Sequence, residues 1–263
     1  MGGRNGGGRL PDVGNILRRI LPGPKPEPIR WYDYGVRQQQ RGNLEEAVRA
    51  YTEALRLDPE MAPAYSNRGS AYLNIGRPEL AIADADEAIS REPRQPVAYS
   101  VLGNAHHALG KAHQEREEQD QAQDEYDQAT RYLSQAIRIN PRFAGFYSDR
   151  GAVHRAAGRL AAAIDDFSQA IRLEKRFPVP YNNRADAYIA TGALDLAIRD
   201  LNEAVKLDPR FAVAFVNRAT ARAMMGQRDQ AQRDINVAVG LGLDRRALEE
   251  MIGQVRPMRR RRV

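Results

Sequence analysis

The stretch AYSNRGSAY, residues 64–72, places an arginine between an aromatic residue and a glycine in a segment that otherwise suggests a packed helix. Variants of it return at FYSDRGAVH (146–154), PYNNRADAY (180–188) and AFVNRATAR (214–222). A charged side chain at a position that its neighbours suggest is buried requires a partner, because an unpaired buried charge is costly. The spacing of these segments indicates what that partner is.

The segments belong to a unit of 34 residues. Aromatic side chains mark one position of six units, at intervals of 34 except for one that is longer by 14: Trp31, Tyr65, Tyr99, Tyr147, Tyr181 and Phe215. With Trp31 as position 4, position 15 is glycine and positions 20 and 27 are alanine in all six units, and position 32 is proline in four. A fixed period of this length indicates stacked repeats rather than one closed core.

These positions predict two antiparallel helices in each unit. Glycine at position 15 ends the first helix, because a left-handed backbone costs glycine nothing, and this expectation includes Gly110 in the third unit. The two alanines lie on one face of the second helix and let a neighbouring backbone come close. Proline at position 32 stops the second helix.

The aromatic, glycine, alanine, alanine and proline pattern resembles the tetratricopeptide repeat. The resemblance implies an all-α fold, a right-handed solenoid of antiparallel helix pairs, over residues 28–243. The expected repeats are 28–61, 62–95, 96–143, 144–177, 178–211 and 212–243. Departures are local: Lys175 replaces a proline, and Ala185 and Ala219 replace an early glycine.

Three further segments flank the repeats. We expect a flexible, basic and Pro/Gly-rich segment at 1–27, a capping helix at 244–254 and an arginine-rich tail at 255–263. A cap is expected because the last apolar face of a repeat array has no neighbour.

The third repeat carries an insertion near 111–124. This segment is rich in Glu, Gln and Ala and has no proline or glycine after Gly110, which favours helix. Fourteen residues make about four helical turns, so two turns can be added to each helix with both faces in phase. Seven acids and one arginine lie between His113 and Gln128, which indicates either a solvated surface or an acidic contact for a basic partner.

The recurring arginines at position 7 are accompanied by aspartates at position 23. The pairs are Arg68 and Asp84, Arg150 and Asp166, Arg184 and Asp200, and Arg218 and Asp234. The two repeats without the arginine also lack the aspartate. This co-occurrence predicts a structural ion pair between the helices of a repeat, since pairing offsets the cost of burying a guanidinium.

Position 6 carries mostly amides and acids. In the tetratricopeptide family the first helices line the concave face, so the resemblance implies that Asn67, Asn183 and Asn217 are rungs of a ladder for a peptide backbone, similar to that of the O-GlcNAc transferase superhelix. A primary amide can donate and accept at once. Asp33 and Asp149 share this position. Side chains expected to add selectivity in this groove are Tyr32, Ser66, Asn104, Asn182 and Asp186. The alternative is that the position 6 side chains support the neighbouring arginine.

The net charge of +6 comes from the ends of the chain. Residues 1–30 carry +4 and residues 256–263 carry +5, which leaves −3 for the rest. The basic ends could contact nucleic acid or an anionic membrane, although no aromatics are interleaved as specific nucleic-acid readout would require. There is no cysteine, no apolar run long enough to span a membrane and no secretory signal, so a cytoplasmic location is expected.

The sequence predicts no catalytic residue, metal or cofactor. The four histidines do not form a convergent set of ligands, and no serine or threonine has a base at readable spacing. The carboxylate clamp of chaperone adaptors is not supported either, because only Asn67 matches it. The expected function is a non-catalytic scaffold that binds a peptide segment of another protein. The alternative is an electrostatic anchor that acts through the basic ends.

Overall fold

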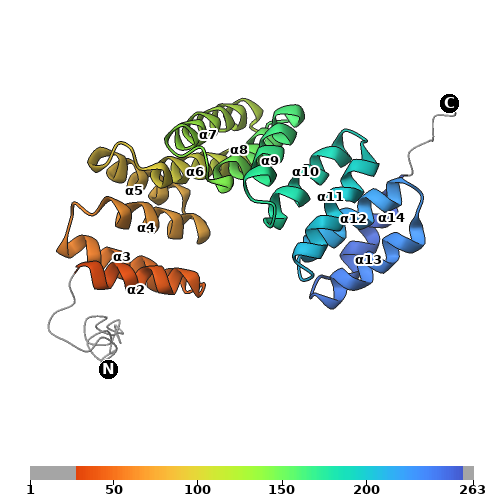
Figure 1. The fold of residues 1–263 in the computed structure, drawn as a ribbon, viewed down its shortest axis with the longest axis horizontal. Helices are drawn as coiled ribbons and strands as arrows, with labels where there is room; N and C mark the ends of the chain where they lie inside the picture. The colour runs from red at the N-terminus through yellow and green to blue at the C-terminus, as the bar shows by residue number, and fades with distance from the viewer. Residues whose placement is uncertain (1–27, 257–263) are drawn as a thin grey trace, which may run out of the picture. The chain divides into compact units, whose positions relative to one another are not determined.

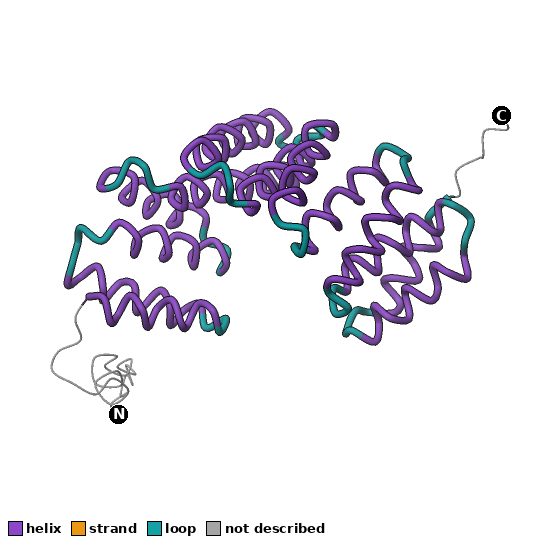
Figure 2. The backbone as a smooth tube through the Cα atoms, viewed as in Figure 1, coloured by secondary structure: helices purple, strands orange, loops and turns teal. Residues whose placement is uncertain are grey.

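The computed structural model describes residues 28–256, which form thirteen α-helices and no strand (Figures 1 and 2). The chain divides into two compact units between Pro93 and Arg94. Unit 1 contains α2 (Pro28–Gln40), α3 (Leu44–Leu57), α4 (Ala62–Asn74) and α5 (Pro78–Arg91). Unit 2 contains α6 (Pro96–Glu115), α7 (Gln119–Ile139), α8 (Ala144–Ala156), α9 (Leu160–Leu173), α10 (Pro178–Ala190), α11 (Leu194–Leu207), α12 (Ala212–Met224), α13 (Arg228–Gly240) and α14 (Arg245–Gln254).

Three of the turns between helix pairs are fixed by an acid or amide that precedes a proline. Asp58 follows α3, and its carboxylate accepts a hydrogen bond from the backbone N–H of Glu60 at 3.1 Å, across Pro59. This side-chain turn stops the helix locally, because the proline cannot continue it. The same bond recurs in two other turns, from Arg210 to Asp208 at 2.9 Å and from Arg142 to Asn140 at 3.3 Å.

In five of the six helix pairs, the core is built from one large side chain of the second helix that faces a small residue of the first, and in α5 the equivalent residue is Ala85. The large side chains are fully buried and share one position of the repeat: Tyr51, Leu133, Phe167, Leu201 and Ile235. A Cβ atom added at Gly151 would lie 2.7 Å from the ring of Phe167. The small residue therefore sets the distance between the two helices of a pair.

The third helix pair corrects the expectation that Gly110 ends a helix. Five glycines at position 15 have positive φ, but Gly110 lies inside α6, and Glu117 has the positive φ (63°) in the turn. The insertion lengthens the pair to 20 residues in α6 and 21 in α7, against 13 and 14 in α8 and α9. A Cβ at Gly110 would lie 2.6 Å from the buried ring of Tyr126, so this glycine serves close packing rather than chain reversal.

Consecutive first helices of unit 2 contact one another, α6 with α8, α8 with α10, and α10 with α12. Among the described helices of unit 2, no second helix contacts the next second helix. The stack of unit 2 therefore curves with its first helices on the inside. We call the surface formed by α6, α8, α10 and α12 the first-helix face.

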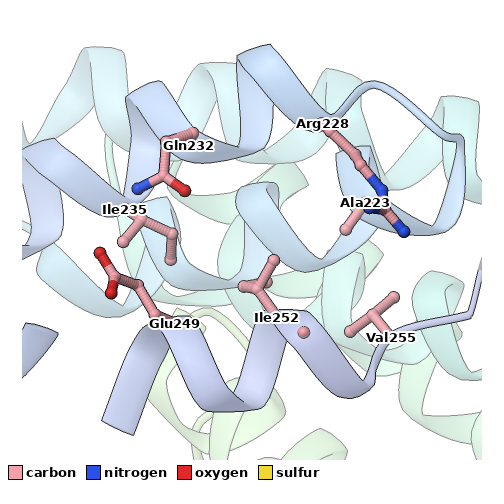
Figure 3. A pocket seen from close by; sticks show the side chains of 8 residues that line it. Ala223, Arg228, Gln232, Ile235, Glu249, Ile252 and Val255 are labelled. Atoms are coloured by element: carbon pink, nitrogen blue, oxygen red, sulfur yellow. The ribbon is translucent and has the colours of Figure 1, made fainter. Parts of the chain in front are cut away.

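The last helix, α14, covers α12 and α13. Its N-cap is Asp244, whose side chain accepts a hydrogen bond from the backbone N–H of Ala247 at 2.7 Å, and the helix buries Leu248. A pocket of about 210 Å³ lies at the seam, and its lining includes Ile235 of α13 and Ile252 of α14, both labelled in Figure 3. The helix thus covers part of the apolar face of the last pair, which has no further repeat beside it.

The close approach at Gly110 leads to a stability prediction. Gly110→Ala improves helix propensity but forces its Cβ into Tyr126, so we expect a loss of about 1–3 kcal/mol in unfolding free energy. The matched control is Gly253→Ala in α14, where an added Cβ meets nothing within 4 Å and a gain of up to about 1 kcal/mol is expected. Urea titrations of both variants decide the matter. Equal gains would show that the contact with Tyr126 does not constrain the pair.

Candidate peptide-binding surface and its support

All four predicted arginine–aspartate pairs are present, and each is bidentate. Nε and Nη2 of the guanidinium donate to the two carboxylate oxygens at 2.7–3.0 Å. The four aspartates, Asp84, Asp166, Asp200 and Asp234, are buried within the second helices. This geometry matches the planar fork of arginine and joins the two helices of one repeat.

Each arginine also reaches the preceding repeat, a contact that the sequence reading missed. Its Nη1 donates to a side-chain oxygen sixteen residues earlier, on the second helix of the previous pair. These acceptors are Thr52 at 3.0 Å, Ser134 at 3.0 Å, Ser168 at 2.8 Å and Asn202 at 2.9 Å. The Ser168 hydroxyl donates its own hydrogen to the Ile164 carbonyl, so its lone pairs are available to Arg184.

The arginines are held as cations. Burial would lower the pKa of Arg68, but the hydrogen bonds and the charge of Asp84 raise this pKa above its ordinary value. Aromatic rings cover the guanidinium of Arg184, with Tyr181 at 6.0 Å and Tyr188 at 5.9 Å. Three of the guanidinium nitrogens donate within the fold, which assigns these arginines to holding the stack together.

Three of the position 6 side chains, Asn67, Asp149 and Asn217, bond to the repeat before them. Asn67 donates to the Tyr32 hydroxyl at 3.0 Å, and Asn217 donates to Asn182 at 2.9 Å. Asp149 accepts hydrogen bonds from Asn104 at 3.0 Å and Ser100 at 3.4 Å. Because these side chains already form hydrogen bonds between repeats, they are less available to bind a peptide backbone than the predicted ladder requires.

Two of the predicted groove residues are buried, which corrects their assignment. Ser66 is 1 % exposed and Asn182 is 5 % exposed. Their position lies between adjacent first helices rather than on the surface of the groove.

The other predicted groove residues lie nearer the surface. Asp33 is exposed and Asn183 is half-buried. Asp186 forms an ion pair with Arg155 at 2.7 Å between α10 and α8.

A pocket of about 290 Å³ lies on the first-helix face and was not expected as a site. Its walls come from three helices: His107, Lys111 and Gln114 of α6, Ala152, Arg155 and Ala156 of α8, and Asn183 of α10. Burial, followed by the charges of Lys111 and Arg155, lowers the pKa of His107 to about 4. His107 is therefore neutral at pH 7, and the fixed charges of the pocket are the two cations.

Exposed aliphatic side chains recur near the start of three first helices. Val97, Val179 and Val213 are each the second residue of their helix and are 42 %, 37 % and 50 % exposed. Exposed aliphatic groups that recur along one face are typical of an interaction surface.

Comparisons with known proteins identify the repeats. Models described as tetratricopeptide or TPR repeats match residues 39–76, 66–126, 107–179 and 180–211, so together they span 39–211. The chain is a tetratricopeptide repeat protein. A thermophilic TPR protein of Thermus thermophilus has a similar structure, with a TM-score of 0.65 and 27 % identity over 74 % of this chain and 98 % of that one. The Cut9 and Hcn1 assembly of the APC/C gives a TM-score of 0.76 at 18 % identity, over 92 % of this chain and 45 % of that one.

Curated relatives match only short parts of the TPR array. A DnaJ homolog subfamily C member 7 homolog of Schizosaccharomyces pombe is 34 % identical over 73 residues, 26 % of this chain and 15 % of the relative. The Hsp70-Hsp90 organizing protein of Triticum aestivum is 38 % identical over 65 residues, 25 % of this chain and 11 % of the relative. The TPR fold, rather than the whole of either relative, is what the chains share.

The described part of the TPR protein offers no group of three His, Asp or Glu side chains placed to hold a metal ion. Within residues 28–256, no helix is both long and apolar enough to cross a membrane. The basic ends lie almost entirely outside the described residues, at 1–27 and 257–263.

The bridging arginines lead to a prediction about a buried charge. Arg184→Ala leaves Asp200 buried without its partner, so we expect a loss of about 3 kcal/mol or more. Arg184→Met combined with Asp200→Leu removes both charges and is expected to lose less. Thermal melts of the two variants test this order, and the reverse order would contradict the structural role of the pair.

A second prediction concerns Asp149, whose pKa is raised by burial against the opposing hydrogen bonds of Asn104 and Ser100. Because the folded state binds the proton more tightly than the unfolded state, stability falls as the pH rises through the raised pKa. Asp149→Asn places here the residue that three other repeats carry, and we expect the Tm to rise by roughly 1–3 °C at pH 7. In calorimetry this gain should vanish below the ordinary pKa of an aspartate. A lower Tm at pH 7 would contradict this reading.

Proposed function

We propose that the protein is a non-catalytic scaffold that binds a peptide segment of a partner protein along the first-helix face of unit 2. The observation that carries this proposal is the exposure of Val97, Val179 and Val213 at one position of three first helices. Repeated aliphatic contacts on the inside of a curved stack suit an extended or helical segment that runs across successive repeats.

Polar groups on the same face would set the register of that segment. Asn183 lines the pocket on the first-helix face, and the Arg155–Asp186 ion pair links the neighbouring first helices α8 and α10 beside it. A half-buried amide can pair with a peptide group, while the valines supply sequence-tolerant contact. The apolar side chains would therefore supply most of the affinity, and the amides would align the peptide.

One further point supports a protein partner, and another bears on the location. Curated relatives include one named for organising Hsp70 and Hsp90, although the match covers a small part of it. The absence of cysteine from the sequence fits a cytoplasmic scaffold, which is part of the proposal.

The first-helix valines provide the test. Val179→Asp combined with Val213→Asp should reduce recovery of the partner at least tenfold in affinity capture from the source cells, because two charges must be desolvated on binding. Both side chains are exposed, so the fold should be unaffected.

The matched control changes exposed aliphatic residues on second helices. Leu196 and Val237 are 42 % and 41 % exposed on α11 and α13. Leu196→Asp combined with Val237→Asp should leave partner recovery unchanged. Loss of the partner in the control but not in the valine variant would place binding on the opposite face and refute the proposal.

A further inference from the structure

The pocket on the first-helix face is lined by hydrogen-bond donors from three helices. We propose that it receives the carboxylate of an aspartate or glutamate side chain within the bound peptide. This assignment rests on the proposed function and specifies the chemistry of the segment that the first-helix face binds.

The charges of the pocket favour an anion. Lys111 has no ion-pair partner among residues 28–256, and Arg155 uses Nη1 on Asp186 while its other N–H groups stay available. Asp186 is the one acid paired with these cations, so the wall carries a net positive charge. The depressed pKa of His107 is a second sign of this positive field, which acts on the imidazole together with burial.

The amides of the pocket also present donors. Oε1 of Gln114 accepts a hydrogen bond from the Tyr126 hydroxyl at 2.8 Å. Oδ1 of Asn183 accepts one from the side-chain amide of Asn182 at 3.1 Å. With both oxygens occupied, each amide offers its NH₂ group to a ligand. Two cations and two NH₂ groups match the lone pairs of one carboxylate.

The position of the pocket selects a peptide side chain over a free ion. Val179 and Asn183 are four residues apart on α10 and therefore lie on the same side of that helix. A segment that covers Val179 thus passes the pocket within about one helical turn. The volume of about 290 Å³ has room for an acidic side chain together with water. On the α8 side the lining includes the small side chains of Ala152 and Ala156.

The test uses two small probes on the full chain, N-acetylglutamate α-amide and its neutral counterpart N-acetylglutamine α-amide. NMR signals of the His107 ring report binding, with assignment by the His107→Gln variant. We expect the glutamate probe to raise the pKa of His107 from about 4 in a saturable way, because a bound carboxylate stabilises the imidazolium. The glutamine probe should have no such effect.

Two charge variants locate the site. Lys111→Gln combined with Arg155→Gln should weaken the glutamate probe at least fivefold. Arg172→Gln combined with Lys175→Gln removes the same charge from exposed positions outside the pocket and should leave binding unchanged. Equal binding by both variants, or equal responses to both probes, would overturn the assignment.

Inorganic phosphate distinguishes the source of the anion. If phosphate saturates the pocket and the glutamate probe does not, the site takes a free anion and the assignment to a peptide carboxylate is wrong. If the Lys111 and Arg155 variant keeps both the partner and the probe while the valine variant loses the partner, the scaffold stands and this assignment falls. If the valine variant keeps the partner but the probe binds as expected, the scaffold proposal fails on its own.

Discussion

Each position 7 arginine joins three helices through one side chain. Arg150 lies on α8, binds Asp166 on α9 with two bonds and binds Ser134 on α7 with a third. Both partners are sixteen residues away, one before and one after the arginine. Because a buried guanidinium without these acceptors would be costly, the stacking of one pair on the next is coupled to the folding of each pair.

This coupling explains where the chain tolerates extra residues. The insertion lies between the two helices of the third pair, so the spacing from Ser134 to Arg150 is still sixteen. It adds seven residues to each helix. The added turns repeat the packing of the turns that this pair shares with the other pairs. A Cβ at Gly103 would meet Leu133, and a Cβ at Gly110, seven residues later, would meet Tyr126, seven residues before Leu133. The end of the array uses a related bond, in which Arg245 of α14 donates to Asn236 at 3.0 Å.

The ion pairs could be predicted from sequence because arginine and aspartate occur and disappear together within one chain. The acceptors of the third arginine bond also share one position of the repeat, at Thr52, Ser134, Ser168 and Asn202. Because three residue types occur there, the sequence does not show them as one column. The burial of Ser66 and Asn182 could not be read from a single repeat, because the neighbouring helix decides which face of a first helix is covered. The pocket combines residues from different positions of three helices, one of them lengthened, and no periodic reading brings these together.

The bonds between repeats leave a division of roles along the first helices. The arginines and three position 6 residues, Asn67, Asp149 and Asn217, hold the stack, and the valines and the donor pocket are the groups to which we assign ligand binding. The most direct measurement of this division is a double-mutant cycle between Arg184 and Ser168, with Arg184→Met and Ser168→Ala, followed by urea unfolding. A coupling of about 1 kcal/mol or more is expected if the arginine binds one repeat to the next. Additive losses would show that the contact between repeats contributes nothing to stability and would contradict the role given to these arginines.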